Sequence, residues 1–370
     1  MAEDQAPNRA LAKLSDQTLA PARSLAERTL AALLDRSDNA LAVPRRLIVA
    51  ADGSAMFTTI GAAISVAVDG DEIVVEPGRY VEHLTIDRSI RLSGHGARDQ
   101  IVLAPPTPEA ACIVITRGAP HLAGFTLDSR PRELVPELQS DGVDWHLLQI
   151  TGGAPVLEAL DLAGRFGIGI HGAGTKGVVR LCSIHDGLTG ISVRVGAQPT
   201  IEHNEIWGLN IQGLDISWPG TAPLVRENRI HHVGIGIRVS GGAEPRIEGN
   251  EIWASEVVGI RIGGRPIAPL VRANRIHDGR GQGIHVFQTN PRIEDNEIWA
   301  NQLEGLCITG IHSSPSITGN TVRDGFGDGI AVLEGASPTI YGNTVTGNAQ
   351  HQIRVADDAS PVIGENVISA

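Results

Sequence analysis

The fold of this chain is decided by four related stretches of six residues: Pro199-Thr-Ile-Glu-His-Asn204, Pro223-Leu-Val-Arg-Glu-Asn228, Pro245-Arg-Ile-Glu-Gly-Asn250 and Pro269-Leu-Val-Arg-Ala-Asn274. Each stretch begins with proline, has an apolar third residue and ends with asparagine, and the stretches recur every 22 to 24 residues. The series continues with prolines at 291, 315, 338 and 361. A repeat of this length, sustained over so many copies, is typical of a solenoid that adds one turn per repeat.

Each repeat also holds a second apolar pair, two residues apart, after a glycine. Residues two apart share one face of a strand, so these pairs predict a second strand with its apolar face turned inward. The pairs are Ile191/Val193, Leu214/Ile216, Ile237/Val239, Ile260/Ile262, Ile284/Val286, Leu306/Ile308 and Ile330/Val332. The leucine spacing of leucine-rich repeats is absent, and a propeller blade needs about 40 residues. The sequence therefore predicts an all-β fold, a right-handed parallel β-helix solenoid over residues 45–370.

The first 44 residues have a different pattern. Leucines at 11, 14, 19, 25, 30, 33 and 34 follow a helical spacing, and Pro21 stands where a second helix can begin. An uncovered parallel-sheet end invites unwanted pairing. We therefore expect residues 1–44 to form a short N-terminal helical cap, with a mobile tail as the alternative.

Composition excludes several classes of protein. The chain has 370 residues, of which 42% are hydrophobic and 3% aromatic, so its core is expected to be aliphatic. A net charge of −12 argues against a nucleic-acid footprint, which needs clustered Lys and Arg. No leader pattern and no run of about 18 apolar residues is present, so we expect a cytoplasmic protein without a membrane partner. The three cysteines match no metal-ligand spacing, and neither a metal nor a cofactor is expected.

The repeat has a second-order period of two turns. Asn-Glu-Ile-Trp begins at 204, 250 and 296, and Asn-Arg-Ile-His at 228 and 274, in each case 46 residues apart. In an in-register parallel sheet this alternation gives columns of opposite charges, which favour one register. The asparagines at the strand junction are expected to form a structural hydrogen-bonded ladder. The two charged columns are Glu158, Arg180, Glu202, Arg226, Glu248, Arg272, Glu294 and Glu205, Arg229, Glu251, Arg275, Glu297.

An aromatic column accompanies these charges: His185, Trp207, His231, Trp253, His277 and Trp299. Ring stacking along the axis, which shields the sheet, is one explanation. The other is a flat aromatic platform, formed by the residues from Trp207 to Trp299, for a sugar polymer or a partner protein.

The other strand of the repeat carries charges that do not alternate. His171, Arg194, Asp215, Arg238, Arg261 and His285 are expected on neighbouring turns of one outward face. Arginines gathered in this way suit an anionic ligand, so these six residues form a candidate binding strip. A solvated polar face without function is the alternative.

The segment between Leu127 and Leu148 interrupts the repeat. An insertion of this kind normally projects as a loop, and loops on a rigid scaffold often carry function. Its candidate acid/base or cation-binding residues are Asp128, Arg130, Asp141, Asp144 and His146.

Residues 52–96, DGSAMFTTIGAAISVAVDGDEIVVEPGRYVEHLTIDRSIRLSGHG, followed by P-x-I-x-x-N-x-I turns, resemble the pectin-lyase-like right-handed β-helix superfamily. In particular the chain looks like the parallel β-helix repeat proteins that carry carbohydrate-binding and sugar-hydrolase (CASH) domains. The resemblance covers residues 47–370 and implies the fold. The same repeats serve lyases, hydrolases, epimerases and noncatalytic binding modules, and the catalytic motifs of pectin methylesterases, polygalacturonases and pectate lyases are missing here.

These observations lead to three expectations. The first is a β-helix module without a recognisable catalytic motif that binds an elongated partner, a polysaccharide or a protein, along its side. The second is a polysaccharide-active lyase, hydrolase or epimerase with its site on the strip of Asp215, Arg238, Arg261 and His285. The third is an assembly scaffold, in which the last turn, SPVIGENVISA, either joins two copies end to end into a homo-oligomer or is covered by a partner.

Overall fold

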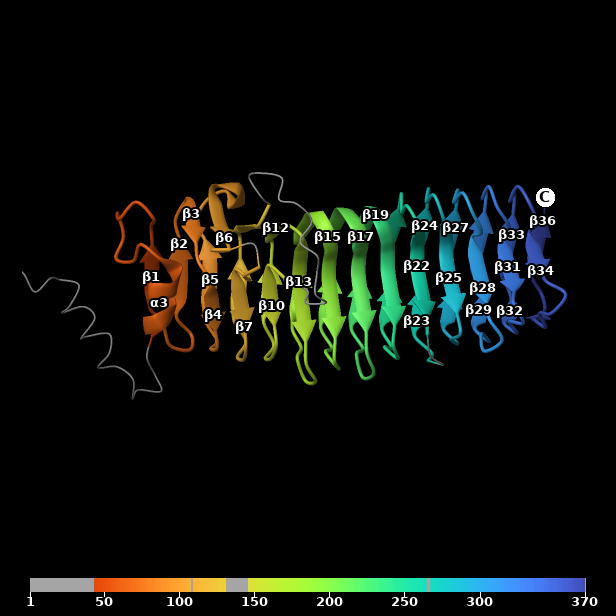
Figure 1. Cartoon of the computed structure of the whole chain (residues 1–370), viewed down its shortest axis with the longest axis horizontal. Helices are drawn as coiled ribbons and strands as arrows, with labels where there is room; N and C mark the ends of the chain where they lie inside the picture. The colour runs from red at the N-terminus through yellow and green to blue at the C-terminus, as the bar shows by residue number, and fades with distance from the viewer. Residues whose placement is uncertain (1–42, 108, 131–145, 265–266, 370) are drawn as a thin grey trace, which may run out of the picture.

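The computed structural model describes residues 43–107, 109–130, 146–264 and 267–369. It shows a long parallel β-helix that runs from β1 at one end to β36 at the other (Figure 1). This confirms the predicted solenoid. A complete turn contributes a strand to each of three faces, and the described strand pairings are parallel.

Face 1 is the 14-stranded sheet made by the Pro-x-Ile stretches. Its strands are β1 (Arg46–Val49), β2 (Glu72–Val75), β5 (Arg91–Gly94), β8 (His121–Ala123), β11 (Val156–Glu158), β14 (Val178–Arg180), β16 (Thr200–Glu202), β18 (Leu224–Arg226), β20 (Arg246–Glu248), β23 (Leu270–Arg272), β26 (Arg292–Glu294), β29 (Ser316–Thr318), β32 (Thr339–Tyr341) and β35 (Val362–Ile363).

Faces 2 and 3 are joined because three long strands bend from one to the other: β15 (Ser183–Arg194), β17 (Glu205–Ser217) and β19 (Arg229–Ser240). The other strands of face 2 are β3 (Gly78–Val81), β6 (Ile101–Ala104), β9 (Thr126–Asp128), β12 (Asp161–Ala163), β21 (Glu251–Trp253), β24 (Arg275–His277), β27 (Glu297–Trp299), β30 (Thr321–Arg323), β33 (Thr344–Thr346) and β36 (Val367–Ser369). The other strands of face 3 are β4 (Leu84–Ile86), β7 (Ile113–Ile115), β10 (Leu148–Ile150), β13 (Phe166–His171), β22 (Val258–Gly263), β25 (Gln282–Phe287), β28 (Leu306–Thr309), β31 (Ile330–Leu333) and β34 (Ile353–Val355).

The core is a single column of aliphatic side chains that runs the length of the helix. All the apolar pairs predicted to point inward, from Ile191/Val193 to Ile330/Val332, are at most 1% exposed. Cys182 is buried in the same core. Stacking apolar positions on successive turns removes them from water, because each side chain packs against its equivalents one repeat before and after it in the sequence.

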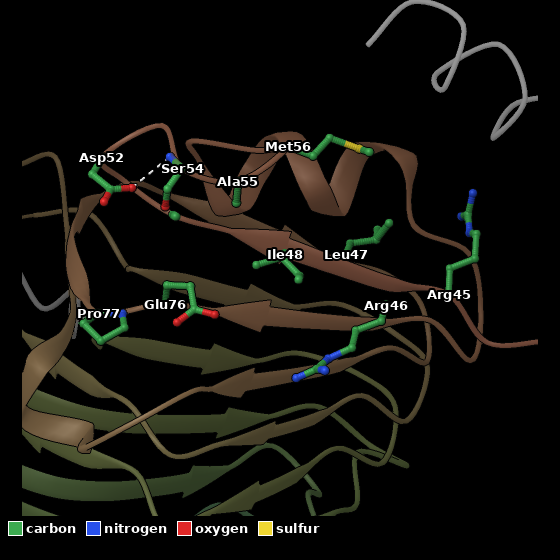
Figure 2. Close-up of a pocket in the computed structure, with 11 residues that line it drawn as sticks. Arg45, Arg46, Leu47, Ile48, Asp52, Ser54, Ala55, Met56, Glu76 and Pro77 are labelled. Carbon is green, nitrogen blue, oxygen red and sulfur yellow. Dashed lines mark hydrogen bonds between the residues drawn. The ribbon is translucent and has the colours of Figure 1, made fainter. Parts of the chain in front are cut away.

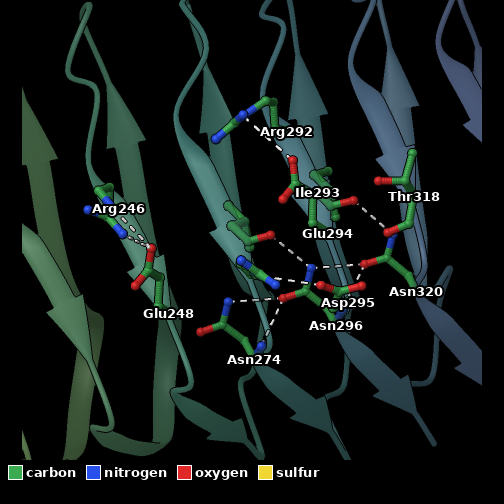
Figure 3. A network of polar contacts seen from close by, with 12 residues as sticks. Arg246, Glu248, Asn274, Arg292, Ile293, Glu294, Asp295, Asn296, Thr318 and Asn320 are labelled. Atoms are coloured by element: carbon green, nitrogen blue, oxygen red, sulfur yellow. Dashed lines mark hydrogen bonds and ion pairs between the residues drawn. The ribbon is translucent and has the colours of Figure 1, made fainter.

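The predicted asparagine ladder is present (Figure 3). Asn274 Nδ2 donates to Asn296 Oδ1 at 3.0 Å, and Asn274 Oδ1 accepts from Asn250 Nδ2 at 3.0 Å. The residue before the asparagine has left-handed backbone geometry, for example Ala273 with φ of 53°. That residue makes the bend, so the asparagine side chain can turn inward and satisfy buried backbone groups.

The alternating charges on face 2 form a continuous chain. Arg229 lies 3.1 Å from Glu205 and 3.8 Å from Glu251, and Arg275 lies 2.8 Å from Glu251 and 3.9 Å from Glu297. The face 1 column has the predicted register, but not every pair forms within it: Figure 3 shows Glu248 bound by Arg246 at 2.8 Å. Exposed pairs of this kind contribute about 0–1 kcal/mol each, so their main effect is on register.

A helix that we did not predict, α3 (Ile60–Val66), packs Ile60, Ala63 and Ile64 into the core beside the first turn. The Glu82 carboxylate accepts hydrogen bonds from the backbone N–H groups of Ile60 and Gly61 at 2.8 Å each. A seven-residue helix fixed by a distant carboxylate leaves little periodic signal, which is why strands were expected here. The predicted cap lies almost entirely outside the described residues, and none of the described helices has the length and apolar character needed to cross a bilayer.

Candidate functional site

The candidate strip lies on face 3, and its residues follow one another from turn to turn. Ser192 pairs in register with Asp215, Asp215 with Arg238, Arg238 with Arg261, and Arg261 with His285. A parallel column begins with His171, which is paired in register with Arg194. Strand spacing therefore sets the residues of the strip about 4.8 Å apart along the axis.

Asp215 is the centre of the strip. Its side chain faces outward but is only 2% exposed, and both carboxylate oxygens are bound by arginine. Arg194 Nη2 donates to Oδ2 at 2.7 Å, and Arg238 Nη1 donates to Oδ1 at 3.2 Å. A buried carboxylate is tolerated only when it is paired in this way. Asp215 thus holds two guanidinium groups, two turns apart, in defined positions.

A shallow groove of about 560 Å³ opens beside this triad. Its lining combines charged, hydroxyl and aromatic groups: Arg194, Asp215, Ser217, Trp218, Pro219, Arg238, Ser240 and Gly241. Sequence reasoning missed Trp218. The available signal was its place in the turn Trp218-Pro219-Gly220, outside the regular column that contains three of the five tryptophans.

The strip continues toward the C-terminus with Arg261 and His285. Arg261 is exposed and makes no ion pair with any residue in the described part of the chain. His285 hydrogen-bonds through Nε2 with Thr309 Oγ1 at 3.2 Å. Burial lowers the pKa of the His285 imidazole, and the positive charge of Arg261 lowers it further. Neutral His285 and charged Arg261 therefore extend the strip beyond the groove.

At the other end of the strip, His146 brings the predicted loop into contact with face 3. Its buried ring lies 5.5 Å from the ring of His171, edge to face, and 5.8 Å from that of Phe166. A Cβ on Gly169 would come within 2.6 Å of His146 Nδ1. Glycine at this outward position thus makes room for the imidazole, and His171, which contacts the His146 ring, is paired in register with Arg194.

The two other loop candidates that the structure describes, Asp128 and Arg130, lie on face 2 and not on the strip. Arg130 binds Asp128 at 3.1 Å and Asp186 at 3.2 Å, and Asp128 ends β9 on face 2. Asp141 and Asp144 lie outside the described residues. Within the described ranges no group of three His, Cys, Asp or Glu side chains is arranged to hold a metal ion.

The aromatic column on face 2 is a continuous stack. From His185 to Trp299, successive ring centroids are 4.1 to 6.2 Å apart, and their planes agree within 19°. The Arg229 guanidinium lies 5.1 Å from the Trp253 ring centroid. Because neighbouring rings cover both faces of each interior ring, mainly ring edges face the solvent. Stacking of the rings along the axis accounts for this geometry. A platform for sugars needs open ring faces. A binding role for the column therefore stays a prediction.

Cys307 follows His285 in the outward column that runs through Asp215, and the column continues with Ala331 and Arg354. Burial raises the pKa of its thiol to about 12, so the thiolate is scarce at neutral pH.

A separate depression of about 710 Å³ lies beside β1 at the N-terminal end (Figure 2). Ala55 and Met56 from the loop before α3 line it together with Ile48 of β1. Its charged groups are satisfied locally: Asp52 accepts from Ser54 N at 2.9 Å, and Arg46 lies 3.8 Å from Glu72. None of the predicted site residues that the structure describes lines it.

Comparisons with known proteins agree with the solenoid. A family model described as a right handed beta helix region matches residues 150–267 and 268–370. Comparison with curated protein sequences gives no match.

Among solved structures, the A-module of mannuronan C-5 epimerase AlgE6 from Azotobacter vinelandii has a TM-score of 0.66 at 17% identity, covering 84% of this chain and 93% of that chain. The catalytic unit of a GH87 alpha-1,3-glucanase from Streptomyces thermodiastaticus has a TM-score of 0.61 at 16% identity, with coverages of 84% and 65%. The periplasmic alginate epimerase AlgG has a TM-score of 0.58 at 14% identity, with coverages of 80% and 77%. At these identities the likeness establishes the fold alone.

Proposed function

Because the chain belongs to the right-handed β-helix family, within the pectin-lyase-like superfamily predicted from its sequence, its faces hold side chains at fixed one-turn intervals, and we propose that face 3 binds an acidic polysaccharide. The observation that carries the proposal is the set of three arginines, Arg194, Arg238 and Arg261, in a strip centred on the groove beside Asp215.

The arginines have the chemistry and the spacing for carboxylated sugars. A guanidinium binds a carboxylate through two parallel hydrogen bonds, which favours arginine for this task. Along the axis, Arg194 and Arg238 are two turns apart, about 10 Å, with Arg194 in the neighbouring column, and Arg261 follows Arg238 one turn later. A ligand whose charges recur along its length can therefore meet successive arginines if it lies along the helix axis.

Electrostatics make this strip unusual on the molecule. The chain carries a net charge of −12, and on face 2 arginine alternates with glutamate. On face 3 the alternation stops, since Arg238 is followed by Arg261 without an intervening acid. Placing like charges on neighbouring turns costs stability, so a ligand that neutralises them is a reason for their presence.

A polysaccharide is favoured over a protein partner by the structural comparisons. The names of all three solved structures describe enzymes that act on polysaccharides, namely epimerases and a glucanase. Their fold is shared by this chain, and face 3 offers a long, open strip in place of the apolar patch that a protein partner usually needs.

The second candidate function is catalysis on the same polysaccharide, and it is favoured by His171, which is paired in register with Arg194. A guanidinium that holds a sugar carboxylate makes the neighbouring C5 proton more acidic, and an imidazole such as that of His171 can act as a base toward it. Return of a proton to the opposite face gives the epimer, whereas departure of the oxygen on C4 gives an unsaturated sugar.

Calorimetric titration with uronic-acid hexasaccharides, prepared from mannuronan and from polygalacturonate, tests the binding proposal. We expect Arg238→Gln and Arg261→Gln each to weaken binding about tenfold, with a smaller salt dependence. The control is Arg246→Gln, which removes an exposed arginine from face 1 and should leave binding unchanged. Equal effects of the three substitutions, or no binding by the wild-type protein, would show that the strip is not the site.

Incubation of the same oligosaccharides in D₂O distinguishes binding from catalysis. An enzyme that removes the C5 proton introduces deuterium at C5 or produces an unsaturated sugar, and His171→Ala should abolish either product. A protein that binds the oligosaccharides but leaves them unlabelled and unbroken is a binding module.

A further inference from the structure

From β13 to β31, the residue that follows each face 3 strand has a positive φ, in the left-handed region of backbone conformation, and bends the chain there. Such a backbone favours glycine, because a Cβ crowds the following carbonyl. The eight positions and their φ angles are Gly172 (101°), Val195 (58°), Trp218 (81°), Gly241 (63°), Gly264 (98°), Gln288 (51°), Gly310 (95°) and Glu334 (53°).

Trp218 is the largest side chain at these positions, and it is 56% exposed. A bulky residue with positive φ is a genuine outlier, which costs free energy that glycine would not cost. Burial does not offset this cost, because more than half of the side chain remains in solvent. The fold therefore gains little from tryptophan at this turn.

The surroundings leave the indole open on one flank. The next two turns have Gly241 and Gly264 at the equivalent position, so neither of these two residues has a side chain that covers Trp218. Trp218 also lines the groove that contains Asp215 and Arg238. In contrast, the rings of Trp207 and Trp253 are stacked against histidines on both faces.

We propose that Trp218 is the sugar-stacking residue of this groove, so that the ligand is a glycan with a pyranose ring against the indole and a carboxylate on that ring or the next at Arg238. The proposal rests on the function proposed above and deepens it. The C–H face of a pyranose is apolar and packs on an aromatic face, while the hydroxyl groups at its rim remain hydrated. Arg238 then recognises the charge and Trp218 the ring.

The test compares Trp218→Gly with Val195→Gly. Both substitutions introduce glycine at the same left-handed position of successive turns, and both remove an exposed apolar side chain, since Val195 is 50% exposed. They therefore change the turn in the same way, but only Trp218 lines the groove. We expect Trp218→Gly to weaken binding of the uronic-acid hexasaccharides about tenfold, and Val195→Gly to leave it unchanged.

Two further readouts separate stacking from a structural role. In the wild-type protein, the hexasaccharide should shift the indole N–H resonance that is missing from the Trp218→Gly spectrum, while the indole resonances of Trp207, Trp253 and Trp299 stay in place. The melting temperature of Trp218→Gly should be no lower than that of Val195→Gly, because glycine suits both turns.

Each outcome has one meaning. If Arg238→Gln weakens binding but Trp218→Gly does not, the stacking role is wrong and the arginine strip stands. If Trp218→Gly and Val195→Gly weaken binding equally, turn stiffness is responsible and the stacking role is wrong. If the wild-type protein binds none of the hexasaccharides, both proposals are wrong.

Discussion

Asp215 should be coupled more strongly to Arg194 than to Arg238, and a pair of double-mutant cycles can measure the difference. The Arg194 hydrogen bond is shorter, 2.7 Å against 3.2 Å, and the Arg194 side chain is 27% exposed against 44% for Arg238. Asp215 itself is 2% exposed in both pairs. Shorter distance and less water both strengthen a charge-assisted hydrogen bond.

The magnitudes follow from these exposures. A hydrogen bond to a charged group contributes about 1.5–3 kcal/mol, so we expect a coupling of about 2 kcal/mol between Asp215 and Arg194. Because Arg238 is more than a third exposed, solvent screening reduces its coupling to about 1 kcal/mol or less. Asp215→Asn alone should cost about 2–3 kcal/mol, since it removes the counter-charge of both arginines.

Urea unfolding of Asp215→Asn, Arg194→Gln, Arg238→Gln and the two double variants supplies the couplings. Other contacts of each arginine cancel in the cycle, which isolates the pairwise energy. Asp295→Asn is the control, because Asp295 binds Arg272 at 3.2 Å but is 54% exposed, and this substitution should cost less than about 1 kcal/mol. Equal couplings, or a stronger coupling to Arg238, would refute the reasoning from distance and exposure.

Three other predictions concern the fold. Asn274→Ala should destabilise the protein by about 3–4 kcal/mol in urea unfolding, because it removes four buried hydrogen bonds at about 1 kcal/mol each, and a loss below about 1 kcal/mol would contradict the ladder. The hydrogen bond from His185 to Asp161 raises the His185 pKa, so its stabilisation is complete below about pH 6.5 and is lost as pH rises through the folded pKa; unfolding of His185→Gln should lack this dependence. Burial raises the pKa of the Cys112, Cys182 and Cys307 thiols to about 12, so a thiol reagent should label the native protein slowly and the urea-unfolded protein at once.

The sequence predicted the structure best at positions that recur from one repeat to the next. Apolar pairs, asparagines and alternating charges recur at a fixed spacing, and stacked turns convert that spacing directly into contacts. The register of the column from Ser192 to His285 was therefore predictable residue by residue. Helix α3 was not, because Glu82, a residue of the next turn, holds its first N–H groups.

The order of the site residues along face 3 was predictable from the sequence, but their burial and their pairing were not. The sequence places Arg194, Asp215 and Arg238 on one face, yet it does not reveal that Asp215 is buried and bound by both arginines. His146 illustrates the same limit, since its place over Gly169 depends on the path of an insertion that follows no repeat. Trp218 was not predicted as a site residue, because it belongs to none of the repeated columns in the sequence.

Some side chains of this structure stabilise the solenoid, whereas others contribute little to its stability and remain available to a ligand. The stabilising side chains interact with their equivalents on neighbouring turns. Each asparagine hydrogen-bonds to the next, and each tryptophan of face 2 stacks on a histidine. Arg261 and Trp218 lack such stabilising contacts. Arg261 follows the like charge of Arg238, and Trp218 is exposed in a turn with strained backbone. Both costs fall on face 3, in or next to one groove. Unfavourable choices gathered at one place are better explained by a ligand than by chance, and a carboxylated sugar compensates both, because it supplies a negative charge for the arginines and an apolar ring face for the indole.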